Sequence, residues 1–124
     1  MCGIVGFFSA DGHNHQNIVE DMMDAIKHRG PDDKGFWHNS ESSVYLGHRR
    51  LSVVDLSSLG HQPITSCSDR YVIVFNGEIY NHLQLRKSLK KSGVNITWRG
   101  HSDTETLLAC IDPWGLKKTI KKCS

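Results

Sequence analysis

Cys2 is the residue whose type and position point most directly to chemistry. It follows Met1, so removal of that methionine would leave one residue with both a thiol and a free α-amine. An α-amine has a pKa of about 8, and its unprotonated fraction near neutral pH can accept the thiol proton directly or through water. Cysteine is small, which favours removal of the preceding methionine. Position alone favours a plainer interpretation, an N-terminal or buried apolar cysteine without a catalytic role, so the rest of the chain must decide.

Other reactive residue types form no recognisable metal or triad motif. His13 and His15 form an HxH pair without a carboxylate-bearing partner pattern, which favours a polar loop over a metal site. The cysteines at positions 2, 67, 110 and 123 contain no CxxC spacing, so neither a zinc ribbon nor a redox pair is indicated. The sequence has no GxSxG elbow for a serine triad and no GxGxxG turn for a dinucleotide.

The elements that must position these residues are predicted by the spacing of apolar side chains. Residues 2–8 form a short apolar run that is typical of a buried strand. Ile18, Met22 and Ile26 recur every four residues, which predicts an amphipathic helix over 17–28 that ends at Gly30-Pro31. The order of elements indicates an α+β chain. Further elements are expected as a hairpin of strands 35–38 and 44–46, strands at 51–54, 71–75 and 96–98, a helix over 82–92, a helix from 102 to Pro113, and a short helix around Leu116 and Ile120.

Composition excludes several classes of protein. The chain has 124 residues, enough for one domain, and a net charge of +2. Its basic cluster at residues 117–122 favours a solvated helix face, and no basic stripe with interleaved aromatics suggests nucleic-acid binding. No stretch resembles an export signal or a membrane span, so we expect a cytoplasmic protein that does not bind membranes.

Six short segments, spread over nearly the whole chain, form a recognisable set: Cys2-Gly3-Ile4-Val5-Gly6, His28-Arg29-Gly30-Pro31-Asp32, His48-Arg49-Arg50-Leu51-Ser52-Val53-Val54-Asp55, Gln62-Pro63, Asn76-Gly77-Glu78-Ile79-Tyr80-Asn81 and Ser102-Asp103-Thr104-Glu105. In this order they resemble the segments of class II glutamine amidotransferases, whose glutaminase domain uses an N-terminal cysteine as nucleophile. Within that class the chain is most similar to asparagine synthetases. The glucosamine-phosphate and purine-pathway members of the class usually carry threonine before the corresponding arginine.

The resemblance implies that residues 2–124 form a type 2 glutamine amidotransferase domain with the αββα sandwich of N-terminal-nucleophile hydrolases. In the family, further apolar strands follow the helical region that closes this chain. We therefore expect a sandwich that is incomplete at its C-terminal end, in a fragment of a larger enzyme. Missing strands leave backbone groups unpaired and an apolar face exposed.

The resemblance also assigns the groups that would bind the substrate. Arg50 would bind the α-carboxylate of glutamine, for which a planar guanidinium is suited because it can donate two parallel hydrogen bonds. Arg49 is the rival for this role, and a surface arginine is the plainer interpretation. Asp103 would bind the α-ammonium group, although position supports a helix-capping acid equally well, since 102–105 fits a capping box. Glu78 is a second candidate for contact with the ammonium group.

By the same resemblance, Asn76 and Gly77 would form the oxyanion hole through a side-chain amide and a backbone N–H. Removing one such donor costs roughly 3–4 kcal/mol of transition-state stabilisation. Local sequence alone favours a different structure, because Asn-Gly is the strongest short signal for a type I′ hairpin. The following Glu-Ile-Tyr-Asn segment and the distant Cys2 favour the oxyanion hole.

The implied function is hydrolysis of glutamine to glutamate and ammonia through Cys2, for the ATP-dependent amidation of aspartate in the parent enzyme. No cofactor is expected in this chain, because ATP and magnesium would bind a synthetase domain whose pyrophosphate loop it lacks. The parent is expected to be a homodimer. Three alternatives stay open: a catalytically inactive fragment, the amidotransferase domain of a surface-polysaccharide pathway enzyme, and a cysteine hydrolase that would not need Arg50 and Asp103.

Overall fold

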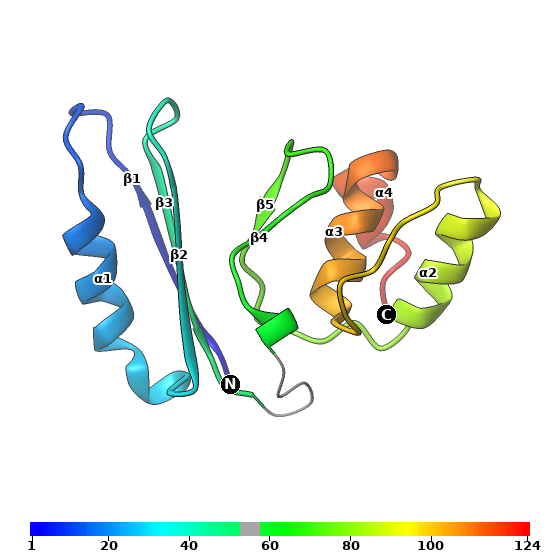
Figure 1. The fold of residues 1–124 in the computed structure, drawn as a ribbon, viewed down its shortest axis with the longest axis horizontal. Helices are drawn as coiled ribbons and strands as arrows, with labels where there is room; N and C mark the ends of the chain where they lie inside the picture. The colour runs from blue at the N-terminus through cyan, green and yellow to red at the C-terminus, as the bar shows by residue number, and fades with distance from the viewer. Residues whose placement is uncertain (53–57) are drawn as a thin grey trace. The chain divides into compact units, whose positions relative to one another are not determined.

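The computed structural model describes residues 1–52 and 58–124, which fold into two compact units (Figure 1). Unit 1 consists of residues 1–52, 61–63 and 74–76, and unit 2 consists of residues 58–60, 64–73 and 77–124. Both units are interrupted in sequence, because the chain passes from one to the other several times after residue 57. The mixture of helices and strands confirms the α+β class.

Unit 1 is a three-stranded antiparallel sheet with a helix on one face (Figure 1). Its strands are β1 (Gly3–Phe8), β2 (Asp33–Asn39) and β3 (Val44–Arg50), in the order β1-β3-β2. Helix α1 (Gln16–Ala25) and the 3-10 turn η1 (Lys27–Arg29) connect β1 to β2. The predicted strand, helix and hairpin of this region are therefore confirmed, and the helical segment does end at Gly30.

Helix α1 packs on the sheet through Val19 and Met23, which are fully buried. The stripe predicted from Ile18, Met22 and Ile26 is wrong at Ile18, which is 48% exposed and lies outside the buried face. Tyr45 of β3 supports the start of the helix: its hydroxyl group accepts a hydrogen bond from the His15 backbone N–H at 3.1 Å and donates one to the His13 carbonyl group at 3.1 Å. Its ring also stacks on Phe7 of β1 with centroids 4.6 Å apart. The face of β3 that carries Tyr45 is thus the face that α1 covers.

Unit 2 contains three helices and a small hairpin. After the 3-10 turn η2 (Ser58–Gly60), strands β4 (Ile64–Thr65) and β5 (Val72–Ile73) pair antiparallel, and helices α2 (His82–Lys91), α3 (Asp103–Trp114) and α4 (Leu116–Ile120) follow. Its core is apolar and lies mainly on α2 and α3. The buried apolar side chains of these two helices are Leu85, Leu89, Leu107, Leu108, Cys110 and Ile111. No helix among the described residues is long and apolar enough to cross a membrane.

Several sequence predictions need correction in unit 2. The strand expected at 96–98 is absent, and these residues form an irregular segment before α3. The strand expected over 71–75 is reduced to Val72–Ile73. Pro113 lies inside the last turn of α3, and the helix ends only at Gly115. A proline this late in a helix removes a single backbone hydrogen bond, so it need not end the helix. Of the strand expected at 51–54, residues 51–52 are not in a strand and 53–54 lie outside the described residues.

Candidate functional site

Cys2 lies immediately before β1, where its thiol contacts the backbone just after β3. The Leu51 backbone N–H donates to Cys2 Sγ at 3.4 Å, and the thiol lies 3.8 Å from the Leu51 carbonyl oxygen. The Cys2 carbonyl oxygen accepts a hydrogen bond from Arg29 Nε at 3.4 Å. Met1 is 79% exposed, so the Met1–Cys2 peptide bond is accessible at the surface. The Leu51 backbone therefore positions the thiol, and the Arg29 side chain holds the Cys2 backbone at this end of the sheet.

The two adjacent arginines of β3 lie on opposite faces of the sheet. Arg49 faces α1: its Nε donates to the Met23 carbonyl oxygen at 3.1 Å, and its Nη2 donates to Asp24 Oδ1 at 3.1 Å. Because side chains alternate along a strand, Arg50 projects from the other face. Gly3 is paired with Arg49, so Cys2, one residue earlier, shares the face of Arg50. The structure thus separates the rivals, since Arg49 binds the end of helix α1.

Residues of the His28-Arg29-Gly30-Pro31-Asp32 segment support this end of the sheet, a role that sequence reasoning did not assign. Besides the contact of Arg29 with Cys2, the Asp32 backbone N–H donates to the Arg50 carbonyl oxygen at 3.1 Å. The carboxylate of Asp32 accepts a hydrogen bond from the Ser52 backbone N–H at 2.7 Å. The segment therefore binds the backbone of Cys2, of Arg50 and of Ser52. The sequence signal for this supporting role was the position of the segment between a predicted helix and a predicted strand.

Asn76 also belongs to unit 1, in the short segment 74–76. The preceding residue, Phe75, donates its backbone N–H to Gln62 Oε1 at 2.6 Å. No strand follows Gly77, and the next regular element is helix α2, so the type I′ hairpin interpretation of Asn76-Gly77 is wrong.

His48 lies on β3 on the same face as Arg50, and it is 1% exposed. Burial lowers the pKa of its imidazole below the ordinary 6.5, although a hydrogen bond with the Phe75 backbone and the nearby charge of Asp33 act to raise it. Electrostatic interactions with His61 and Arg50 lower the pKa further.

Gly77, Glu78 and Asp103 belong to unit 2. Asp103 is the first residue of α3, and its Oδ2 accepts a hydrogen bond from the Ile79 backbone N–H at 2.8 Å. Its Oδ1 accepts one from the Thr104 backbone N–H at 2.8 Å. The Asp103 carboxylate therefore holds the segment directly after Glu78 against the N-terminus of α3.

The capping box expected at 102–105 forms only in part. Ser102 is the N-cap of α3 and accepts a hydrogen bond from the Thr104 backbone N–H at 3.2 Å. The Glu105 side chain does not complete the box; it accepts hydrogen bonds from the backbone N–H groups of Arg99 at 2.8 Å and Gly100 at 3.1 Å. Glu105 thus holds the loop before α3 rather than the N-cap residue.

The partly buried guanidinium of Arg86 holds the same loop. Arg86 of α2 donates to the carbonyl oxygens of Gly100 at 3.0 Å and Ser102 at 3.1 Å, and to the Thr106 hydroxyl group at 2.7 Å. Its guanidinium carbon lies 3.8 Å from the centroid of the Trp98 ring. These contacts account for the irregular backbone at 96–102, because its polar groups are satisfied by side chains instead of a neighbouring strand.

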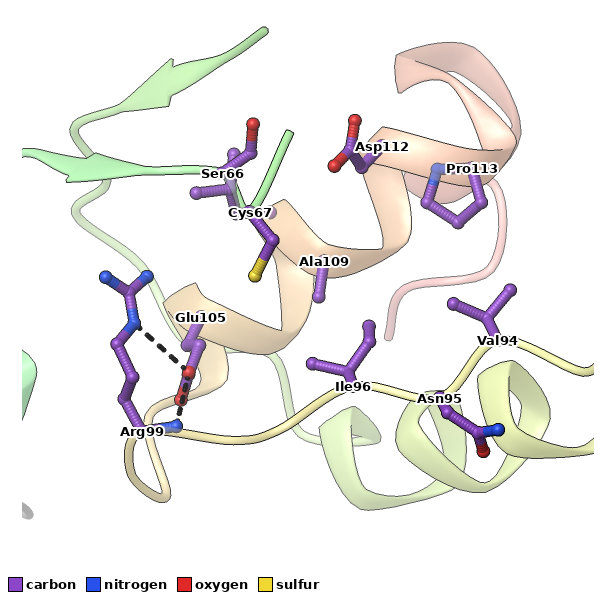
Figure 2. A pocket seen from close by; sticks show the side chains of 11 residues that line it. Ser66, Cys67, Val94, Asn95, Ile96, Arg99, Glu105, Ala109, Asp112 and Pro113 are labelled. Carbon is purple, nitrogen blue, oxygen red and sulfur yellow. Dashed lines mark hydrogen bonds and ion pairs between the residues drawn. The ribbon is translucent and has the colours of Figure 1, made fainter. Parts of the chain in front are cut away.

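The pocket in unit 2 is a separate feature from the candidate site residues. It has a volume of about 320 Å³ and lies between α3, the segment 94–99 and the residues after β4 (Figure 2). Figure 2 shows Arg99 and Glu105 together at one end, with their ion pair at 3.5 Å. Neither Glu78 nor Asp103 lines it. Over the described ranges 1–52 and 58–124, no three His, Cys, Asp or Glu side chains gather to hold a metal ion.

Comparison with known proteins gives a consistent result. A family model described as a glutamine amidotransferase domain matches residues 1–124. Asparagine synthetase [glutamine-hydrolyzing] 1 of Bacillus subtilis is 42% identical over 113 residues, which is 88% of this chain and 17% of that protein. Asparagine synthetase [glutamine-hydrolyzing] 1 of Arabidopsis thaliana is 37% identical over 118 residues, covering 94% of this chain and 19% of that protein.

A relative with a different name matches equally well in extent. Amidase chry2 of Gibberella zeae is 35% identical over 127 residues, which is 94% of this chain and 18% of that protein. The chain therefore spans about a fifth of the length of the curated relatives it matches.

Proposed function

The chain belongs to the glutamine amidotransferase domain family, and on that basis we propose that it hydrolyses glutamine to glutamate and ammonia with Cys2 as the nucleophile. The position of the Cys2 thiol carries the proposal: its Sγ accepts the Leu51 backbone N–H at 3.4 Å, on the face of the sheet from which Arg50 projects. A thiol on the same sheet face as a guanidinium suits an amide substrate that also carries a carboxylate. This pairing favours glutamine over a simple amide.

The reaction begins after removal of Met1 has freed the Cys2 α-amine. The amine takes the thiol proton, and the sulfur atom attacks the carbon of the side-chain amide to form a C–S bond. Negative charge develops on the former carbonyl oxygen, where the Asn76 amide and the Gly77 backbone N–H donate hydrogen bonds. The α-ammonium group returns the proton to the nitrogen as the C–N bond breaks, and ammonia leaves. Water then cleaves the γ-glutamyl thioester, which gives glutamate and restores the thiol.

Three charged residues select the amino-acid end of the substrate. Arg50 binds the α-carboxylate, and the engagement of Arg49 with Met23 and Asp24 supports this choice. Asp103 binds the α-ammonium group. Its carboxylate also accepts a hydrogen bond from the Ile79 backbone N–H, and Glu78, the second candidate for this contact, directly precedes Ile79 in the sequence. A substrate without its α-carboxylate or α-amine is accordingly bound poorly.

The proposed fold of the domain is the αββα sandwich of N-terminal-nucleophile hydrolases. The sheet of unit 1 supports it, because apolar side chains on the face opposite α1 are exposed: Ile4 is 43% exposed and Phe8 is 67% exposed. An apolar sheet face of this kind is stable when a second sheet stacks on it at about 10 Å.

In the parent protein, the ammonia is used for the ATP- and magnesium-dependent amidation of aspartate. The names of two relatives, asparagine synthetases of the glutamine-hydrolysing type, support this acceptor, whereas a third relative is named an amidase. In this proposal ATP and magnesium bind in the part of the parent protein that amidates aspartate. The parent is a cytoplasmic homodimer in this proposal.

The test is intact mass spectrometry of the purified chain with and without a diazo-oxo-norleucine-type glutamine analogue. We expect a species that lacks Met1 and gains one adduct, which disappears in Cys2→Ala. Cys67→Ala is the matched control, because Cys67 is an exposed thiol outside the site and its removal should leave the adduct in place. Retention of Met1, or an adduct that is lost in Cys67→Ala and kept in Cys2→Ala, would refute the assignment. Turnover of glutamine but not of simple amides completes the test.

A further inference from the structure

We propose that Gln62 is a positioning residue that orients Asn76 as an oxyanion donor. The inference deepens the proposed function and rests on it. Gln62 does not contact the reacting atoms in this role. It acts through the backbone of Phe75, the residue directly before Asn76, and all three residues lie in unit 1.

The contact between Gln62 and Phe75 is short and partly buried. Gln62 Oε1 accepts the Phe75 backbone N–H at 2.6 Å, and Gln62 is 7% exposed. An N–H that loses its acceptor in a partly buried place is destabilised, so the segment would shift to find another partner. Asn76 follows on the next peptide plane, and its amide would shift with the segment.

Gln62 is itself fixed by contacts with β2. The neighbouring His61 Nδ1 lies 2.7 Å from Asp33 Oδ2. Gly35 allows the Gln62 backbone to approach closely, because a Cβ atom at position 35 would lie only 1.7 Å from the Gln62 carbonyl oxygen. Segment 61–63 is therefore seated on the sheet, and its side chain reaches a defined place at Phe75.

Such fixing matters for rate more than for binding. An oxyanion donor interacts with charge that is present only in the transition state, so a misplaced donor lowers kcat and leaves KM nearly unchanged. A residue that merely stabilises the fold would instead lower the active fraction or the melting temperature. The two roles are therefore separable by kinetics.

The experiment compares Gln62→Met, which keeps the length of the side chain and loses the acceptor, with Gln62→Glu, which keeps an oxygen at the same reach. Gln84→Met is the matched control, since Gln84 is exposed on α2. We expect kcat for glutamine hydrolysis to fall about 10- to 100-fold in Gln62→Met, less than the ~100- to 1000-fold of losing a donor outright. Gln62→Glu should recover part of the loss, and Gln84→Met should match the wild type.

Inhibition by the γ-aldehyde analogue of glutamine supplies a second measurement. The thiol adds to this aldehyde to give a hemithioacetal, whose new oxygen occupies the oxyanion position. In Gln62→Met its inhibition should weaken by the same factor as kcat, whereas product inhibition by glutamate should be unchanged. The comparison reports only on folded enzyme that binds the inhibitors. Partial unfolding does not affect it, because inhibition by the aldehyde and by glutamate is measured on the same sample.

The outcomes separate the inference from the proposed function. A wild-type chain without Cys2-dependent glutaminase activity would overturn both. An active wild type, with Gln62→Met at wild-type kcat or with aldehyde and glutamate inhibition weakened equally, would overturn the positioning role alone.

Discussion

Replacing the two arginines of β3 one at a time should give opposite phenotypes. Arg49→Met should destabilise the protein and leave the KM for glutamine unchanged, because Arg49 binds the end of α1. Arg50→Met should raise KM, because in the proposed function Arg50 binds the substrate α-carboxylate. The two residues are adjacent and chemically identical, so the comparison depends only on the face of the strand.

The expected magnitudes follow from the contacts. A charge-assisted hydrogen bond such as that from Arg49 Nε to the Met23 carbonyl oxygen contributes about 1.5–3 kcal/mol. The pair with Asp24 adds only about 0–1 kcal/mol, since that carboxylate is 62% exposed. The free energy of unfolding should therefore fall by about 2–3 kcal/mol, and Tm by roughly 8–12 °C. For Arg50, loss of about 1.5–3 kcal/mol of substrate binding corresponds to about a 10- to 100-fold higher KM.

Urea unfolding followed by circular dichroism measures the first quantity, and steady-state glutaminase kinetics measures the second. Arg50→Lys is an informative companion, since a lysine cannot donate the paired hydrogen bonds of a guanidinium and should recover little of the loss in KM. A rise in KM for Arg49→Met at unchanged stability would show that the assignment of the two faces is wrong.

Three further predictions concern the surroundings of the site. Gly35→Ala should lower the free energy of unfolding by about 1–3 kcal/mol and reduce kcat, because the new Cβ atom would displace Gln62. Urea unfolding measures the loss of stability, and steady-state kinetics measures kcat. Burial lowers the pKa of His48 below 6.5, so the unfolded chain is protonated before the folded one as the pH falls. The contribution of the neutral imidazole to folding stability is therefore complete above about pH 6.5 and is lost as the pH falls through the lower folded pKa. His48→Gln should flatten this pH dependence of the urea midpoint. Iodoacetamide should label exposed Cys67 rapidly in the native protein and spare Cys110, because burial raises the pKa of that thiol to about 12; peptide mapping by mass spectrometry measures both.

Each of these has a clear contradiction. Unchanged kcat in Gly35→Ala would separate the glycine from the site. Equal pH dependence of the wild type and His48→Gln would mean that this histidine does not titrate between the folded and unfolded states. Labelling of Cys110 at the rate of Cys67 in native protein would contradict its burial.

The helices were predictable from the sequence because their apolar residues recur with the helical period. The buried face of α1 was less predictable, because Val19 and Met23 are buried whereas Ile18 of the predicted stripe is 48% exposed. The strand expected at 96–98 was wrong for a tertiary reason. Trp98 lies under the Arg86 guanidinium, and Glu105 takes the N–H groups that follow, so side chains far apart in sequence satisfy this segment as a loop. Periodicity within the segment cannot report such partners.

The candidate site was predictable as a set of motifs, and less so as an arrangement. The alternation of a strand predicts that Arg49 and Arg50 face opposite sides, but only the docking of α1 decides which side each occupies. For Asn76-Gly77 the local sequence strongly predicted a hairpin turn. That prediction was wrong because the Phe75 backbone N–H donates a hydrogen bond to Gln62 and the next regular element is a helix. Whether these residues catalyse the proposed reaction stays a prediction for the kinetic tests.

The interrupted course of unit 1 limits how the protein can be dissected. Segments 61–63 and 74–76 belong to unit 1 although the chain has already entered unit 2. Gln62 of the first segment packs against Gly35 and accepts a hydrogen bond from Phe75 of the second. An expressed fragment that stops before residue 61 would carry all three strands of that sheet and yet lack these two inserts. A fragment truncated where the chain first enters unit 2 would therefore contain the sheet without segments 61–63 and 74–76. A chimaera that transfers unit 1 must include residues 1–76.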